Sequence, residues 1–274
     1  MKSLPPLVPR PSVILVLELL GIDDPSMPEG RRRQAFELVE QYLGRALLGD
    51  KLAKRQGLQL LVTGRQVIRI APIKPGGTRL FDELLDIVHL QGDLILEGVF
   101  IRGALTLGDV ATRVGRAVGS GIDHAARLCT EVADVPRVIV DPRLIREAEG
   151  NADLRAEHHA VPQELGYIRD ILRRDGDGLW FVDYLKACAS EVEDHSAYVN
   201  IIDQHGLLIE QRLNASVQLD GTSRTWTWLW QYHNMIVGEW QAAQRDNIAE
   251  WEPFFIPSQS PLVYAFPPSI KPPR

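Results

Sequence analysis

A single carboxylate interrupts an apolar stretch near the start of the chain. Glu18 lies within SVILVLELLGID, residues 12–23, in a run that is typical of a buried strand. Removing an unpaired carboxylate from water costs several kcal/mol, so such a charge is almost always neutralised by a partner. That partner is either a metal ion or a basic side chain, and the two alternatives predict different proteins.

Other charged residues stand where they can meet an anionic ligand. Asp123 and Arg127 are four residues apart on one helical face, either as an intrahelical ion pair or as part of a site. Arg102 lies in an apolar, strand-like segment, either on the solvated face of a sheet or in contact with a phosphate. His124 has no second histidine at metal-binding spacing, so we interpret it as a histidine on the helix surface.

Composition excludes several classes of protein. The two cysteines, Cys129 and Cys188, cannot form a disulfide framework or a zinc site, and we expect both to be buried free thiols. A formal net charge of -6 argues against a general nucleic-acid-binding surface. No stretch approaches the roughly 18 apolar residues of a membrane span, and prolines interrupt the first residues where a signal peptide needs an apolar core. We therefore expect a soluble cytoplasmic protein that binds neither nucleic acid nor a membrane.

Hydrophobic periodicity predicts the elements that position these residues. A strand begins near Ser12, and a helix follows from Glu29 to about Gly49. GLQLLVTGRQVIRIAP, residues 57–72, predicts a hairpin that turns at Gly64-Arg65. Helical periodicity then returns over residues 80–96.

The segments that follow continue the alternation of strands and helices. Residues 98–110 predict a strand in which Gly103 and Gly108 permit a close approach of backbone or ligand. After it come a second strand or loop at 113–121, a short helix at 122–134, and an apolar strand at 136–145 that Asp141-Pro142 closes. The order β-α-β-β-α-β predicts a ferredoxin-like α+β fold, with an antiparallel-dominated sheet and helices over one face.

The composition changes after about residue 150, so we divide the chain into a first domain at 1–150 and an extension at 151–274 packed on it. The extension is expected to hold a polar loop at 151–166, a strand at 177–185, and long helices at about 191–213 and 223–244. The last helix gathers aromatic and aliphatic side chains on one face, which favours packing or dimer formation. The proline-rich tail is expected to be irregular.

Two motifs of this sequence resemble those of a known family. GVFIRGALTLG and GSGIDHAARLCTEVADVPRVIVDP resemble the second half of class III nucleotidyl cyclase domains, and most of all the pyrimidine nucleotide cyclases of bacterial anti-phage Pycsar systems. Those proteins have an Arg-Gly-Gly strand where this chain has Arg102-Gly103-Ala104. The strand end LELLGI, the PRVIVDP segment and the helix WTWLWQYHN agree as well, so the resemblance covers residues 12 to about 145 and about 180 to 245.

The resemblance implies a composite site at a head-to-tail dimer interface. In such cyclases two aspartates hold two Mg²⁺ or Mn²⁺ ions, which neutralise the triphosphate and help the 3′-hydroxyl to attack the α-phosphorus. Here the first aspartate aligns with Glu18, and the second aligns with Arg65, or with Gly64 if the register slips by one. Neither Arg65 nor Gly64 can bind a metal cation. Arg127 aligns with the transition-state arginine of adenylyl and guanylyl cyclases, four residues after an asparagine that is Asp123 here.

Three interpretations follow from this departure. The first is a cyclase homologue that has lost catalysis and binds a nucleotide or a protein partner, with no cofactor. The second is an active cyclase that makes cyclic UMP or cyclic CMP from UTP or CTP, with Glu18 alone holding one Mg²⁺ or Mn²⁺ ion and Arg127 assisting. The third is a regulatory subunit that forms a heterodimer with an active cyclase. The missing carboxylate favours the first, and cyclase activity is expected to be absent or residual.

The resemblance also leads to a set of expected contacts. Arg65, Arg102, Gly103 and Asp123 are the expected nucleotide-binding residues. Because a guanidinium can take a carboxylate with two parallel hydrogen bonds, Glu18 and Arg65 are expected to form a direct ion pair with no metal between them. We also expect a homodimer, since the family is dimeric and since strand 99–108 and the helix from Trp226 offer apolar surface.

Overall fold

The structure is a computed structural model that describes residues 7–45, 47–113, 116–192, 194–216, 223–243 and 252–256. The first six residues and the proline-rich tail from residue 257, which the sequence predicts to be irregular, lie outside the described residues. None of the described helices is long and apolar enough to cross a membrane.

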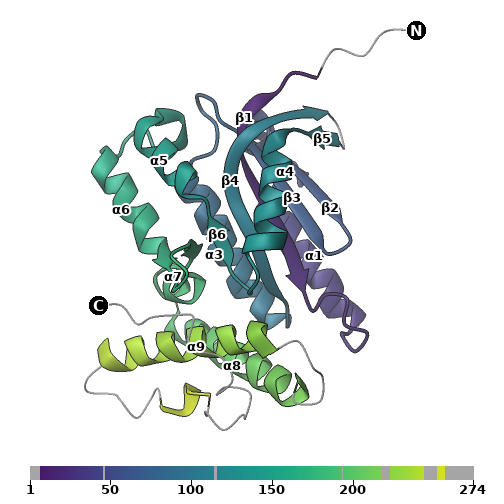
Figure 1. Ribbon diagram of the computed structural model, residues 1–274, viewed down its shortest axis with the longest axis vertical. Helices are drawn as coiled ribbons and strands as arrows, with labels where there is room; N and C mark the ends of the chain where they lie inside the picture. Colours follow the sequence, from purple (N-terminus) through teal and green to yellow (C-terminus); the bar gives the residue numbers. More distant parts are fainter. Residues whose placement is uncertain are drawn as a thin grey trace.

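One mainly antiparallel sheet organises the chain (Figure 1). Its order is β2-β3-β1-β4-β6-β8-β7, with β5 paired to β4, and β4–β6 is the parallel pair among the described strands. The first four of these strands have the order of a ferredoxin-like fold, so the predicted α+β class is confirmed. The strands are β1 Arg10–Leu20, β2 Gln59–Thr63, β3 Gln66–Pro72, β4 Phe100–Arg113, β5 Arg116–Val118, β6 Val138–Val140, β7 Leu172–Arg174 and β8 Trp180–Val182.

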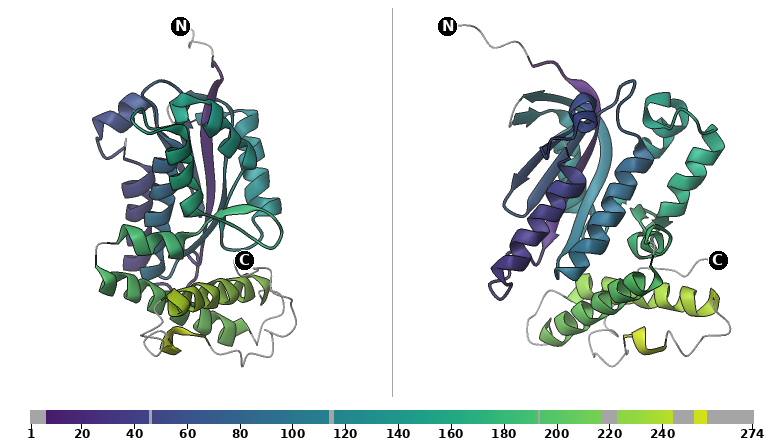
Figure 2. Two further views of the ribbon diagram at one scale, coloured as in Figure 1. Left: turned by 90° about the vertical axis from the view of Figure 1, so that its left-hand side faces the viewer. Right: turned by 180° about the vertical axis from the view of Figure 1, so that it is seen from behind.

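Helices pack on both faces of this sheet. Seen from behind in Figure 2, α1 and α3 lie over one face, whereas α4 lies over the other face in Figure 1. The helices are α1 Glu29–Leu43, α2 Lys51–Gln56, α3 Leu80–Leu96, α4 Ser120–Arg127, α5 Pro142–Gly150, α6 Val161–Ile171, α7 Tyr184–Glu191, α8 His195–Ser216 and α9 Ser223–Ala243. A π-helical turn, Leu128–Val132, continues α4.

The expectation that helices cover one face is therefore wrong, and β1 gives the physical reason. Val13 and Leu15 point into the main core, whereas Ile14 and Val16 belong to a second, smaller core beneath α4. A strand that is central in the sheet and covered on both faces reads as a continuous apolar run rather than as an alternating one. Both cysteines are free and buried as expected, and Cys129 belongs to the second core.

Three predicted boundaries are wrong for local reasons. The first helix ends at Leu43, and a separate α2 begins after Asp50, whose carboxylate accepts hydrogen bonds from two amides of its first turn. In the segment predicted as a strand at 136–145, Asp141-Pro142 closes the strand as expected, but the remaining residues begin α5, with Asp141 as its cap and proline in its first turn. The region 151–166, predicted as a loop, contains the start of α6, again with proline in the first turn.

The extension after residue 150 contributes to the same sheet. β8 pairs with β6 and β7 pairs with β8, while α8 and α9 form the two long helices at nearly the predicted positions. On α9, Trp228 and Tyr232 are buried, and both rings contact Phe181 of β8. The predicted packing role of this aromatic face is therefore confirmed, whereas the domain boundary near residue 150 stays a prediction.

Two buried histidines join α8 to α9. The rings of His205 and His233 stack with their centroids 5.2 Å apart and their Nδ1 atoms at 3.0 Å. His233 Nε2 donates to the carbonyl of Phe254 at 2.7 Å, so its Nδ1 accepts a hydrogen bond from His205 Nδ1. His205 Nε2 in turn accepts from the hydroxyl of Tyr184 at 2.7 Å. This chain of bonds requires both rings to be neutral.

The histidine pair predicts acid sensitivity of the fold. Burial lowers the pKa of His233 to about 4 and that of His205 well below its ordinary value, whereas both titrate near 6.5 in an unfolded chain. The unfolded state therefore binds more protons below pH about 6.5, and stability falls from there towards pH about 4, by at most about 1.4 kcal/mol per pH unit and histidine. Urea unfolding of the wild type and of His205→Gln and His233→Gln between pH 7.5 and 4.5 measures this. Equal pH slopes in all three proteins would contradict it.

Candidate functional site

The carboxylate of Glu18 is held between two arginines at the end of β1. Its Oε1 forms an ion pair with Arg65 Nε at 2.7 Å, and its Oε2 lies 2.5 Å from both Nε and Nη2 of Arg102. The strand register places Glu18 directly opposite Arg102 on β4 and Gln66 on β3. The predicted ion pair between Glu18 and Arg65 is confirmed, and Arg102 joins it.

Burial and charge differ among the members of this cluster. The side chain of Glu18 is 13% exposed, that of Arg102 is 27% exposed, and that of Arg65 is 52% exposed. Arg65 also reaches Asp23, an exposed carboxylate, through Nη1 at 3.3 Å. The carboxylate with its two guanidiniums carries a net charge of about +1 in formal terms, and Asp23 offsets that charge only at the exposed rim.

A tight hairpin brings Arg65 to this position. β2 ends at Thr63 and β3 begins at Gln66, so Gly64 and Arg65 form a two-residue loop. Gly64 has a positive φ of 57°, as a type II′ turn requires at its first central residue. The amide of Leu19 donates to the carbonyl of Arg65 at 2.8 Å, which ties the tip of the hairpin to β1.

A second polar cluster surrounds Asp141 at the end of β6. Its Oδ2 accepts hydrogen bonds from Thr106 at 2.7 Å, Arg143 Nη2 at 2.7 Å and His124 Nε2 at 3.2 Å, while Oδ1 accepts from the amide of Arg143. Burial acts to raise the pKa of Asp141. Hydrogen bonds from Arg143, Thr106 and His124 outweigh burial and hold that pKa well below its ordinary value. Asp141 is therefore a permanently charged acceptor at neutral pH.

The other expected site residues are placed differently. Arg127 contacts His124 Nδ1 at 3.1 Å, and among the described residues no ion pair joins it to Asp123, so the intrahelical pair is wrong. Asp123 is exposed at the start of α4. A Cβ on Gly103 would lie 2.3 Å from the carbonyl oxygen of Val16, which makes this glycine a requirement of the contact between β4 and β1. Its expected role in nucleotide binding stays a prediction.

Sequence reasoning missed Asp141 and misread His124. The signal for Asp141 was present, because aspartate followed by proline is typical of a helix start rather than of a strand end. The role of His124 depends on the position of α4 over β4, where Gly108 and Gly121 let the two backbones meet. A Cβ on Gly108 would lie 2.5 Å from the Cα of Gly121.

The donor set at Glu18 does not fit a divalent metal ion. Both carboxylate oxygens are already in ion-pair contact with guanidiniums, and a cation there would be repelled by Arg65 and Arg102. In the part of the chain that the structure describes, no cluster of three or more histidine, cysteine, aspartate or glutamate side chains has the arrangement of a metal site. The residues present therefore support no step through Mg²⁺ or Mn²⁺.

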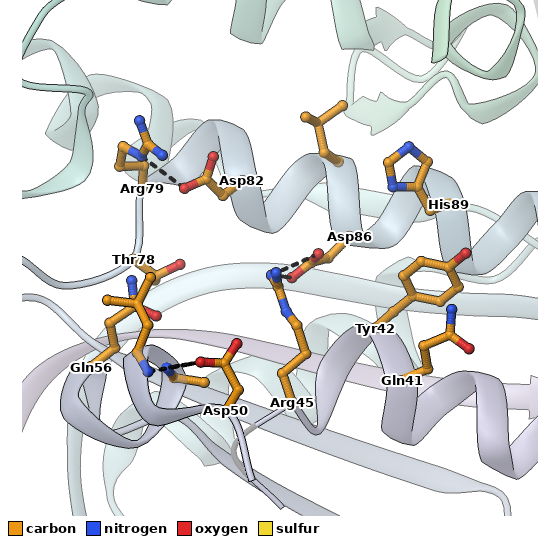
Figure 3. A pocket seen from close by; sticks show the side chains of 13 residues that line it. Gln41, Tyr42, Arg45, Asp50, Gln56, Thr78, Arg79, Asp82, Asp86 and His89 are labelled. Atoms are coloured by element: carbon orange, nitrogen blue, oxygen red, sulfur yellow. Dashed lines mark hydrogen bonds and ion pairs between the residues drawn. The ribbon is translucent and has the colours of Figure 1, made fainter. Parts of the chain in front are cut away.

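A cavity lies on the opposite face of the sheet, between α1, α2 and α3 (Figure 3). It measures about 530 Å³, and Arg45 reaches across it to Asp86 at 2.7 Å. Arg69 lies beneath, fully buried, and is held by Glu83 and Asp86. Burial raises the pKa of Asp86 to about 6, although the positive charges of Arg69 and Arg45 act to lower it. None of the residues expected from the sequence to form a site lines this cavity.

Known proteins resemble this chain in structure but not in sequence. No protein-family model matches the chain, and no curated protein matches its sequence. An adenylyl cyclase from P. aeruginosa is 12% identical with a TM-score of 0.38, over 65% of this chain and 95% of that one. The monomeric guanylyl cyclase domain of the RhoGC fusion protein from Blastocladiella emersonii is 14% identical with a TM-score of 0.36, over 64% and 95%. An adenylate/guanylate cyclase/hydrolase from Silicibacter pomeroyi is 17% identical with a TM-score of 0.36, over 51% and 79%.

The unequal burial of the two arginines predicts unequal costs of removing them. Arg102→Ala leaves Glu18 largely buried with one exposed partner, and we expect it to lower the free energy of unfolding by about 1–3 kcal/mol. Arg65→Ala removes a half-exposed partner and should cost less than about 1 kcal/mol. Urea unfolding at pH 7 measures both, with Arg169→Ala, which breaks an exposed pair with Glu149, as the control. A cost for Arg65→Ala that equals or exceeds that of Arg102→Ala would contradict this assignment.

Proposed function

We propose that this chain is a nucleotide-cyclase homologue, related to the pyrimidine nucleotide cyclases of anti-phage signalling, that binds a nucleoside triphosphate without a divalent metal and no longer cyclises it. The single observation that carries the proposal is the carboxylate of Glu18 held by two guanidiniums. The motifs around Arg102 and from Gly119 to Pro142 supply the link to the cyclases.

The loss of catalysis follows from what a guanidinium can and cannot do. It can neutralise a phosphate oxygen and donate hydrogen bonds to it. It cannot coordinate the 3′-hydroxyl and lower the pKa of that hydroxyl, as a divalent ion does. Arg65 therefore substitutes for the electrostatic part of a metal site and leaves the attacking hydroxyl without activation.

Retained binding follows from the donors that remain available. Among the described residues, Arg65 uses Nε and Nη1, and Arg102 uses Nε and Nη2, in their contacts with carboxylates. Arg65 Nη2 and Arg102 Nη1 stay available to an anionic ligand. The net charge of about +1 on Glu18 and its two partners attracts such a ligand even though the whole chain carries a formal charge of -6.

A homodimer is part of this proposal, although the surfaces that first favoured it are used inside the protomer. β4 is a central strand, and Trp228 and Tyr232 of α9 are buried. Better support comes from the sheet face that carries Val16. There, Leu61 of β2 and Ile68 of β3 are only half-buried, and β2 lies beside α4 rather than under it (Figure 1). A second copy, or a different and active cyclase, would cover them, and light scattering distinguishes a dimer from a monomer of about 31 kDa.

Cyclase activity is expected to be absent. The purified protein is incubated with ATP, GTP, CTP and UTP in turn, with Mn²⁺, and products are separated by mass spectrometry. Formation of cyclic UMP or cyclic CMP that Glu18→Ala abolishes would contradict the proposal and favour an active cyclase with an ion on Glu18.

Metal dependence should appear when the missing carboxylate is restored. Arg65→Asp places two carboxylates beside each other, so Mn²⁺ should raise the melting temperature of this variant by several degrees and leave the wild type unchanged. Arg65→Asn is the matched control, because it removes the cation without adding a carboxylate. A wild-type protein that Mn²⁺ stabilises as much as Arg65→Asp would overturn the metal-free assignment.

A further inference from the structure

Asp141, His124 and Arg127 form a hydrogen-bonded chain of side chains that has no role in the site described so far. Two separate segments supply it: the end of β6 carries Asp141, and α4 carries both His124 and Arg127. Its contacts are continuous, with His124 Nε2 at 3.2 Å from Asp141 Oδ2 and His124 Nδ1 at 3.1 Å from Arg127 Nη2. Thr106 of β4 and Arg143 of α5 complete the shell around the carboxylate.

The chemistry of the two ends determines the tautomer of His124. Arg127 can only donate, so His124 Nδ1 must accept. Asp141 is ionised and can only accept, so His124 Nε2 must carry the proton. A neutral His124 ring with its hydrogen on Nε2 therefore connects the Asp141 carboxylate to the Arg127 guanidinium. Because Asp141 fixes the orientation of the ring, the ring in turn fixes the position of the guanidinium.

Burial decreases along this chain towards solvent. The side chain of Asp141 is 8% exposed, that of His124 is 23% exposed, and Arg127 lies on the exposed side of α4. An exposed arginine without a partner samples many rotamers, and ordering it upon ligand binding lowers affinity. The acceptor at His124 engages Nη2 alone among the described contacts, which leaves Nε and Nη1 of Arg127 to take a phosphate oxygen.

The position of α4 brings these three side chains to the face of the sheet that carries Glu18. Thr106 and Arg102 are on β4 four residues apart, so they share one face and are separated by about 13 Å along the strand. The turn that follows α4 carries Cys129, which packs in the second core with Ile14 and Val16, on the face of β1 that also carries Glu18. The two polar clusters therefore share one side of the sheet.

We propose that His124 is a positioning residue, oriented by Asp141, that holds the guanidinium of Arg127 ready for a phosphate oxygen of the bound nucleotide. The inference rests on the proposed nucleotide-binding function and deepens it. It separates two roles on α4: Arg127 contacts the ligand, and His124 acts through Arg127.

A double-mutant cycle tests this division of roles. The probe is a fluorescent UTP analogue, titrated in EDTA. Arg127→Ala should weaken binding about tenfold or more, and His124→Ala several-fold. In the Arg127→Ala background, His124→Ala should have no further effect, because the residue that it positions is gone. Additive losses in the double variant would overturn the positioning role.

Two conservative variants separate the two bonds of His124. His124→Asn keeps an acceptor at the place of Nδ1 but loses the bond to Asp141, so its affinity should fall only in part. His124→Gln keeps a donor at the place of Nε2 and loses that acceptor, so its affinity should fall towards that of Arg127→Ala. Equal melting temperatures of the two variants show that a general loss of packing is not the cause. The reverse order of affinities would overturn the inference.

The tautomer gives a readout that needs no nucleotide. Nitrogen NMR of the labelled wild type should show His124 protonated at Nε2, with an Nδ1 resonance that moves in Arg127→Ala. A proton on Nδ1 would overturn the positioning role whether or not a nucleotide binds. A wild type that binds no nucleotide would overturn both this inference and the proposed function, whereas equal binding by all variants would overturn the inference alone.

Discussion

The candidate site depends on the ion pairs between the Glu18 carboxylate and two guanidiniums. A carboxylate on the central strand of a sheet that is covered on both faces must be neutralised, because its desolvation would otherwise destabilise the fold. Arg65 and Arg102 do so from two neighbouring strands. These ion pairs neutralise the Glu18 carboxylate and occupy both of its oxygens. The carboxylate therefore cannot bind a metal ion at the same time.

On the sheet face that α4 covers, further polar residues join the Glu18 cluster. α4 reaches β4 closely because Gly108 and Gly121 allow backbone contact, and the helix thereby carries His124 and Arg127 to the side where Glu18 lies. Glu18 with its two guanidiniums carries a formal charge of +1, although the chain as a whole is acidic. Anion binding therefore depends on the fold rather than on overall charge.

The cavity between α1 and α3 shows why volume alone does not identify a functional site. Its walls hold charges of both signs that are already paired, as Arg45 is with Asp86. Below it, Arg69 forms ion pairs with two carboxylates and donates hydrogen bonds to the carbonyls of Tyr42 and Leu43. These bonds hold α1, α3 and β3 together, which is a sufficient physical reason for such a costly buried network.

The sequence by itself determined that Glu18 needs a cation, that Gly64-Arg65 forms a hairpin tip, and that two long helices lie in the last third of the chain, because desolvation, turn geometry and helical periodicity act within a few residues. The tertiary structure alone decided that Arg102 shares the carboxylate and that Arg127 meets His124 instead of Asp123. It also decided that β7 and β8 join the sheet. These outcomes depend on strand register and on the placement of α4 over β4, and such contacts between residues far apart in the chain leave no periodic signal in the sequence.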